Sequence, residues 1–447
     1  MSTTRWLKVG AASMALALAA VGCGGGRNDD SSSGGGGGGS SATTAPGGAF
    51  SISTKDCQDY QGTQGVTGDT IRLGSSFPQS GLYSAYAEIS KGYEAYFKYV
   101  NANGGVNGKK IEIITKDDQY DSGKTKSNTQ ELTQKDGVFA MFNVVGTASN
   151  LAIRDDLGEE CIPNLFAATG SQLMGNPAKY PWLIGSIPTY ATESAIFADY
   201  LKTNKPNAKV AILAQNDDLG TGYTAAFKKA IEGTGITVVK EEKYNSTDPD
   251  VKSQITTLSS SGADTALIAA TALKCPQALN SIKESGWSPL TYISGTCTSN
   301  TVVGLAPEAN VGVLSSIYLK DPADPEWAND AAMKEFQTLG AQYGLTEKEL
   351  QNGIVGYGWT MGALLVNTLK QAGTIDRQTV MQAAYNLKNQ QVGLLLPGIT
   401  VNTDGTKDPY PIEQMQIGKY GVNGPYWDLQ GQVVSFEGKT GGYAPNS

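Results

Sequence analysis

Residues 70–115 read TIRLGSSFPQSGLYSAYAEISKGYEAYFKYVNANGGVNGKKIEIIT, which predicts a strand, a helix and a second strand. Ile71 to Phe77 is the first strand. Ser84 to Asn103 predicts a helix, because its apolar residues recur at spacings of four, three and four on one face. The glycine pair 104–105 ends this helix as a C-terminal cap does. Lys110 to Thr115 is the second strand.

The alternation of strand and helix continues to residue 167 and then starts again at residue 209. Further strands are predicted at 138–144, 162–167, 209–215, 237–244, 265–270 and 290–295, and helices at 122–135, 148–158, 222–233, 251–261 and 276–285. This order is typical of parallel sheets covered by helices, and its repetition predicts two similar lobes. A helix-rich stretch over 325–387 and a turn-rich final segment from Gly393 favour a chain that crosses between the lobes several times.

The first residues predict export. Arg5 and Lys8 precede an apolar run from Val9 to Val21, and small residues lead to Cys23. We expect residues 1–22 to be a signal peptide and Cys23 to be the lipidated N-terminus of a lipoprotein. The alternative is an ordinary secretory signal with an incidental cysteine. The Gly/Ser-rich segment 23–65 is expected to be a flexible tether to the membrane anchor.

Composition excludes several classes of function. The net charge of -8 and the pI near 4.9 argue against a nucleic-acid partner, which needs a basic surface. Histidine is absent, which excludes Ser-His-Asp and Cys-His catalysis and histidine-ligated zinc. We expect no enzymatic activity, no cofactor and no metal.

Cysteine usage agrees with an oxidising compartment. Besides Cys23 the chain holds Cys57, Cys161, Cys275 and Cys297, enough for two disulfides with three possible connectivities. Their order favours a pair of Cys57 with Cys161 and a pair of Cys275 with Cys297. Four buried thiols are the alternative.

Several short motifs resemble one family, the Leu/Ile/Val-binding branch of the type 1 periplasmic binding proteins. They are the opening GSSFPQSG at 74–81, the YVNANGGVNGK string at 99–109, the aspartate pair 117–118, Ile-Pro at 162–163 and Ala-Ala-Thr at 167–169. The resemblance implies two Rossmann-like α/β lobes joined by a three-strand hinge. The first lobe would hold residues 66–187 and 320–391, and the second 188–319 and 392–447.

The resemblance also implies a function. A small molecule would be bound in the cleft between the lobes, and the closed form would deliver it to the permease of an ABC importer in the cytoplasmic membrane. In amino-acid-binding members the α-carboxylate is held at places that match Gly146, Thr147 and Thr169, with Ala167 beside them. An aromatic residue of the first loop matches Tyr86.

On the second lobe the chain departs from the family pattern. Thr296 stands where the family has a glutamate for the α-ammonium, Leu219 and Thr271 stand where aromatic residues enclose the ligand, and Tyr190 replaces an aspartate. Burying an ammonium without a carboxylate is unfavourable. We therefore expect an amino acid-like ligand, or a small carboxylic acid or amide with an accepting head group at Gly146, Thr147 and Thr169. A ligand-sensing receptor domain with a separate signalling partner is the alternative function.

Overall fold

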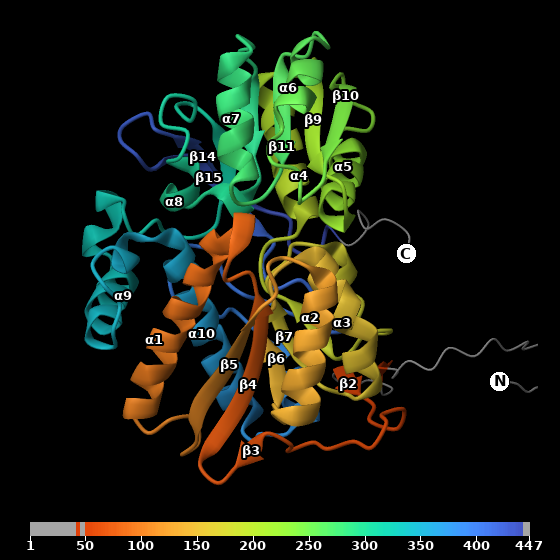
Figure 1. Cartoon of the computed structure of the whole chain (residues 1–447), viewed down its shortest axis with the longest axis vertical. Coiled ribbons are helices and arrows are strands. Elements are labelled where there is room, and N and C mark those ends of the chain that lie inside the picture. Colours follow the sequence, from red (N-terminus) through yellow and green to blue (C-terminus); the bar gives the residue numbers. More distant parts are fainter. Residues whose placement is uncertain (1–41, 45–49, 441–447) are drawn as a thin grey trace, which may run out of the picture. The chain divides into compact units, whose positions relative to one another are not determined.

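A computed structural model, which describes residues 42–44 and 50–440, shows two α/β lobes (Figure 1). The strands are β1 (Ala42–Thr44), β2 (Phe50–Ile52), β3 (Val66–Thr67), β4 (Thr70–Phe77), β5 (Lys110–Asp117), β6 (Ala140–Phe142), β7 (Asn164–Ala167), β8 (Leu183–Gly185), β9 (Lys209–Gln215), β10 (Thr237–Tyr244), β11 (Thr265–Ala269), β12 (Leu290–Ile293), β13 (Leu314–Ile317), β14 (Gln414–Tyr420) and β15 (Trp427–Ser435). The helices are α1 (Glu88–Ala102), α2 (Ser122–Gln130), α3 (Thr147–Glu159), α4 (Tyr190–Asn204), α5 (Asp218–Ala230), α6 (Lys252–Ser259), α7 (Lys274–Glu284), α8 (Asn300–Val303), α9 (Ala331–Gln342), α10 (Gly353–Ala372) and α11 (Arg377–Ala384).

The two large sheets share one strand order. In the first lobe β4 lies between β5 and β6, and β7 and β8 follow, all parallel. In the second lobe β9 lies between β10 and β11, and β12 and β13 follow in parallel. Strands β14 and β15 add an antiparallel edge to the second sheet. In each lobe the strand order therefore reverses beside its first strand, where doubly wound sheets form a binding crevice at the carboxyl ends of the strands.

The predicted fold class is confirmed, and two local predictions differ from the structure. Strand β8 follows a loop with no periodic apolar pattern, so its three residues gave no sequence signal. The first helix begins at Glu88 rather than Ser84, because a 3-10 turn over Gly81–Ala87 precedes it. That turn carries Tyr83 and Tyr86 toward the second lobe.

The lobe boundaries also differ in detail from the predicted ones. Residues 50–65, predicted to belong to the tether, are folded against the first lobe: Ile52 is buried and the Gln58 N–H donates to the Glu159 carbonyl. Residues 392–413 contact the first lobe, since Thr403 Oγ1 lies 2.7 Å from the Ala384 carbonyl oxygen and the Tyr410 hydroxyl 3.1 Å from that of Gln172. The second lobe resumes at β14.

The predicted signal peptide, residues 1–22, and the predicted lipidation site Cys23 lie outside the described residues. Within the described part of the chain, no helix has the length and apolar character needed to cross a membrane.

Both predicted disulfides are confirmed. Cys57 is bonded to Cys161, which fastens the segment before β3 to the end of α3, and Cys275 is bonded to Cys297 in the second lobe. The second bond joins the start of α7 to the turn after β12. That turn carries Gly295 and Thr296.

Helix α10 returns to the first lobe and crosses α1 at very short range (Figure 1). A Cβ on Gly358 would lie 2.0 Å from the Ile89 carbonyl oxygen, and a Cβ on Gly92 would lie 2.1 Å from that of Val355. Only glycine allows two backbones to approach so closely. The crossing places the starts of both helices, with Ile89 and Tyr357, at the edge of the cleft.

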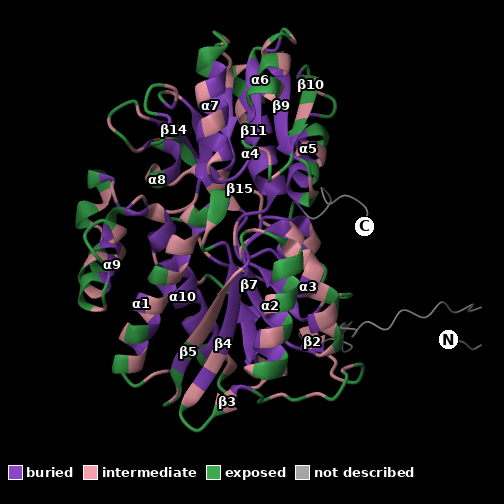
Figure 2. Ribbon diagram, in the orientation of Figure 1, coloured by how far each residue is buried: buried purple, intermediate pink, exposed green. Residues whose placement is uncertain are grey.

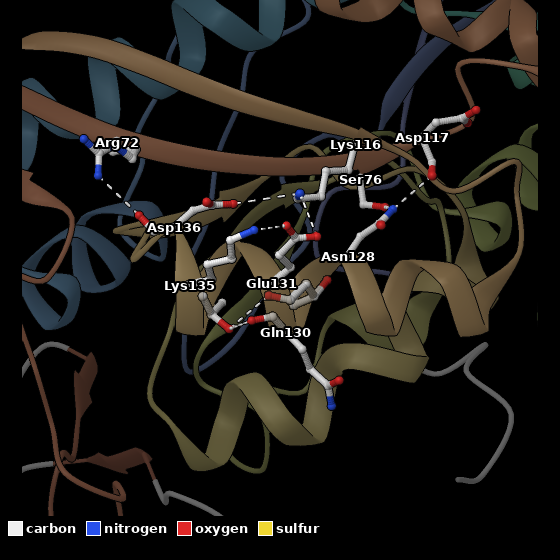
Figure 3. Close-up of polar contacts among 11 residues, drawn as sticks. Arg72, Ser76, Lys116, Asp117, Asn128, Gln130, Glu131, Lys135 and Asp136 are labelled. Carbon is white, nitrogen blue, oxygen red and sulfur yellow. Dashed lines mark hydrogen bonds and ion pairs between the residues drawn. The ribbon is translucent and has the colours of Figure 1, made fainter.

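Burial and charge are arranged as this layered fold requires. The sheets and the inward helix faces are buried, and the outward helix faces are exposed (Figure 2). At the surface of the first lobe, Lys116 Nζ lies 2.9 Å from Glu131 Oε2 and 3.9 Å from Asp136 Oδ2, which ties β5 to the helical turn after α2 (Figure 3). Such exposed pairs contribute little each. The buried apolar faces therefore supply most of the stability.

Gly358→Ala tests the helix crossing. The added methyl would meet backbone atoms, so we expect the free energy of unfolding to fall by more than about 2 kcal/mol in urea denaturation. The control is Gly158→Ala in α3, where no atom lies within 4 Å of the new Cβ. Removing a helical glycine there should be neutral or stabilising by about 0.5–1 kcal/mol. Equal effects of the two variants would contradict the proposed role of the crossing.

Candidate functional site

A cavity of about 130 Å³ lies between the lobes, outside the carboxyl ends of the strands. Most of its wall is apolar or aromatic. The lining residues are Tyr86, Ile89, Tyr120, Val145, Gly146, Ala168, Ile187, Pro188, Tyr190, Glu193, Leu219, Thr271, Gly295, Thr296, Thr298, Ser299, Ile317, Tyr318, Leu319, Lys320, Asp321, Gly353, Ile354, Tyr357 and Trp427. The cavity thus lies at the crevice that the strand order predicts.

Two tyrosines of the 3-10 turn bridge the lobes beside this cavity. The Tyr86 hydroxyl accepts the Ala272 N–H at 3.2 Å and donates to the Thr296 carbonyl at 3.3 Å. The Tyr83 hydroxyl lies 3.4 Å from Gln215 Oε1, and its ring stacks on Tyr120 with centroids 4.1 Å apart. These contacts join the first lobe to the ends of β9 and β11, so the structure is a closed form.

The predicted head-group site has a different arrangement from the expected one. Thr147 Oγ1 lies 2.7 Å from Thr169 Oγ1, and the Tyr190 hydroxyl lies 3.3 Å and 3.2 Å from these two oxygens. Gly146 and Tyr190 line the cavity, whereas Thr147, Ala167 and Thr169 lie behind them. The threonine hydroxyls therefore bond to Tyr190 in this closed form. Their contact with a ligand stays a prediction.

The second-lobe residues predicted for the site do reach the cavity. Leu219, at the start of α5, Thr271 and Thr296 all belong to its lining. Both threonine hydroxyls have protein partners: Thr271 Oγ1 donates to Gln215 Oε1 at 3.2 Å, and Thr296 Oγ1 to the Ala270 carbonyl at 3.3 Å. With Tyr86, Gly146 and Tyr190, the fold thus brings six of the predicted residues to one cavity, and their role in binding stays a prediction.

Glu193 is the most consequential residue that the sequence did not reveal. It lies in the first turn of α4, is almost fully buried, and accepts the Gly295 N–H at 2.7 Å through Oε2. Burial raises the pKa of this carboxyl to about 7, against the partial opposing effect of the hydrogen bond from Gly295. A glutamate in a first helical turn is ordinary, because it complements the helix dipole. Its burial depends on the turn after β12, which carries Gly295. The sequence around Glu193 therefore gives no sign that this carboxyl is buried.

Three further residues of the lining were not predicted from the sequence. Lys320 and Asp321 follow β13, and Lys320 Nζ lies 2.8 Å from Asp330 Oδ1. Tyr357, on α10, also lines the cavity, and its hydroxyl bonds to Asn143 and Ser186 at 2.9 Å each. Trp359, two residues on, is a core residue that meets Phe336 edge to face.

The chain is similar to known binding proteins. A family model described as periplasmic binding protein matches residues 70–424. A curated relative, Leu/Ile/Val-binding protein homolog 3 of Brucella melitensis, is 27% identical over 198 residues, which are 43% of this chain and 52% of that protein. The chain thus spans about half the length of this relative.

Two solved structures share the fold. A branched chain amino acid ABC transporter protein from Thermus thermophilus with bound valine has a TM-score of 0.73 and 18% identity, covering 82% of this chain and 96% of that one. A solute binding protein of an ABC transporter from Rhodopseudomonas palustris, in complex with 3,4-dihydroxy benzoic acid, has a TM-score of 0.69 and 22% identity, covering 84% and 99%.

Tyr86→Phe tests the bridge between the lobes. The variant loses the hydroxyl that accepts from Ala272 and donates to Thr296, which should weaken the closed state by about 1 kcal/mol. We expect a larger radius of gyration in small-angle X-ray scattering without ligand. The control is Tyr426→Phe, whose exposed hydroxyl bonds within its own loop. An unchanged scattering profile would show that Tyr86 does not hold the closed form.

Glu193→Gln tests the burial of that carboxyl. Its folded pKa of about 7 lies above the ordinary 4.5, so unfolding releases a proton between these values. The free energy of unfolding of the native chain should therefore fall as the pH rises through this window, and level off above it. The expected extent is up to about 3 kcal/mol, at about 1.36 kcal/mol per pKa unit. Urea unfolding should show that the free energy of unfolding of the variant rises relative to that of the native chain between about pH 5 and pH 8. Equal pH dependences of the two free energies would contradict this prediction.

Proposed function

This chain belongs to the periplasmic binding protein family, and from that premise we propose that it captures a small molecule between its lobes for delivery to an ABC importer. The family consists of binding proteins, not enzymes. The observation that carries the proposal is the cavity between the lobes, which residues of both lobes line and which Tyr83 and Tyr86 bridge.

The size and the lining of the cavity restrict the class of ligand that it can hold. A cavity of about 150 Å³ with apolar walls holds a molecule the size of benzene, and the cavity of about 130 Å³ here is similar. The lining includes the rings of Tyr86, Tyr120, Tyr318, Tyr357 and Trp427. We therefore propose a ligand with a compact, largely apolar body. Valine in the Thermus structure and 3,4-dihydroxy benzoic acid in the Rhodopseudomonas structure are bodies of this kind.

Location forms the second part of the proposal. The basic and apolar start of the chain, the small residues before Cys23 and the Gly/Ser-rich segment after it support export and lipid anchoring outside the cytoplasmic membrane. The two disulfides suit the same oxidising compartment. A chain tethered there would present its captured ligand to a membrane-embedded permease.

A thermal-shift screen of the purified chain tests capture. The compounds would be amino acids, aromatic and aliphatic acids, amides, amines and sugars of small size. A ligand at about 100 times its dissociation constant should stabilise the closed form by about 2.7 kcal/mol, because it binds only the folded chain. Leu219→Trp, whose larger side chain would occupy space in the cavity whatever the charge of the ligand, should abolish the shift. A shift that survives this substitution would place binding outside the cavity.

A further inference from the structure

The charges around the cavity are unevenly distributed. Among the described residues that line it, the charged side chains are Glu193, Lys320 and Asp321. Lys320 is almost fully buried and forms an ion pair with Asp330 at 2.8 Å, so its charge is already balanced. The two remaining carboxyls belong to different lobe connections: Glu193 lies on α4 and Asp321 follows β13. Neither forms an ion pair in the described part of the chain.

Asp321 has a carboxyl oxygen without a hydrogen-bond donor. Its Oδ1 accepts the Ala323 N–H at 3.0 Å, whereas no donor lies in hydrogen-bonding geometry to the buried Oδ2, and the neutral Asn300 side chain is the polar group beside the carboxyl. Burial raises the pKa of this carboxyl to about 6, and nearby Asp324 adds to the shift. Leaving such an oxygen unsatisfied is unfavourable, and a donor from outside the chain would relieve it.

Glu193 is surrounded by uncharged groups. The Gly295 N–H donates to its Oε2 at 2.7 Å, and the hydroxyls of Tyr223 and Tyr292 also act on the carboxyl as neutral donors. The nearby hydroxyls of Tyr223, on α5, and Tyr292, on β12, bond to Ser294 and Ser316 at 2.7 Å and 2.6 Å. Tyr318 also faces the carboxylate. The groups around Glu193 are thus uncharged, and none of them balances a carboxylate.

Groups that would receive an anion are engaged elsewhere. The hydroxyls of Thr147 and Thr169 bond to Tyr190, as described above, and the Gly146 N–H donates to the Ala168 carbonyl at 3.2 Å. Aromatic rings, in contrast, attract cations through their faces. A wall of tyrosine and tryptophan rings with two unpaired carboxyls is therefore suited to a positive charge.

We propose that the ligand is a small organic amine without a carboxylate, whose protonated nitrogen is held by Glu193 and Asp321 while its apolar body lies among the aromatic rings. This inference rests on the proposed function, because it assumes that the cavity is the binding site. It departs from the head-group site predicted at Gly146, Thr147 and Thr169, and it gives Asp321 Oδ2 a donor and Glu193 a positively charged partner.

Isothermal titration of the full chain tests the proposal with compounds of one size. Benzylamine, benzoate and benzyl alcohol differ only in the head group, and isobutylamine, isovalerate and valine provide an aliphatic set. We expect the amines to bind at least about tenfold more tightly than their matched acids, and valine to bind less tightly than isobutylamine. Glu193→Gln and Asp321→Asn should each weaken the amines at least about tenfold. The control Glu308→Gln removes an exposed carboxyl far from the lining and should change nothing.

The pH dependence provides a second measurement. An amine stays protonated across this range while Glu193 ionises, so amine affinity should rise about tenfold per pH unit below about 6 and level above about 8. In Glu193→Gln the part of this slope between about pH 6 and pH 8 should disappear, whereas the part below about pH 6, where Asp321 ionises, should remain. A pure loss of folding would lower the amount of binding-competent chain without removing the slope.

The outcomes separate the two proposals. Tighter binding of benzoate, isovalerate or valine, with affinity unchanged or improved in Glu193→Gln, overturns the amine proposal and leaves small-molecule capture standing. Binding of none of the six compounds contradicts the proposed capture of a compact apolar body, and the amine proposal fails with it. Amine binding that depends on both carboxyls supports both.

Discussion

The contact between α1 and α10 is the constraint on which the rest of the molecule depends. Gly92 and Gly358 let two helices that are far apart in the sequence meet backbone to backbone. Because α10 follows the first strands of the second lobe, this contact obliges the chain to leave the first lobe, build most of the second and return. The lobes are thereby joined by several connections, and one wall of the cleft is built from the starts of both helices.

The residues that line the cavity contribute both favourably and unfavourably to the stability of the closed form. Its apolar and aromatic wall is ordinary core chemistry and stabilises the closed form through burial. Glu193 acts in the opposite direction, because a buried carboxyl without a positive partner disfavours the folded state once it ionises. A ligand that supplies the missing charge would remove this cost only when the lobes are closed. Binding and closure are then coupled through one residue, as expected when a ligand favours one of two conformations.

In the hydrogen-bond network behind the cavity, the Tyr190 side chain takes the place that was predicted for the head group of the ligand. The resemblance predicts that Tyr190 replaces a family aspartate, and its hydroxyl lies 3.3 Å from Thr147 Oγ1 and 3.2 Å from Thr169 Oγ1. A carboxylate at that place would need its own donors, whereas a tyrosine hydroxyl both donates and accepts. Under the amine proposal, Tyr190 closes the Thr147 and Thr169 end of the cavity, and Glu193 and Asp321 provide its polar end.

The alternation of apolar strands and amphipathic helices was sufficient to predict two parallel α/β lobes. The order of the cysteines favoured one of three possible connectivities, and the structure shows that pairing. The 3-10 turn at 81–87 and strand β8 were missed because short elements carry no period. Tyr86, Gly146, Tyr190, Leu219, Thr271 and Thr296 line the cavity, and it was the family resemblance rather than periodicity that selected them; their contact with a ligand stays a prediction.

Periodicity and composition are local properties, so the sequence by itself determined the elements, the lobes and the absence of histidine chemistry. Which side chains balance one another across the cleft was decided only by the tertiary structure. Glu193 meets Gly295, a hundred residues away in sequence, and Asp321 reaches the same cavity from the opposite connection. The charge of a binding site is the sum of the charges of groups that folding brings together, so no single segment of the chain is sufficient to predict it.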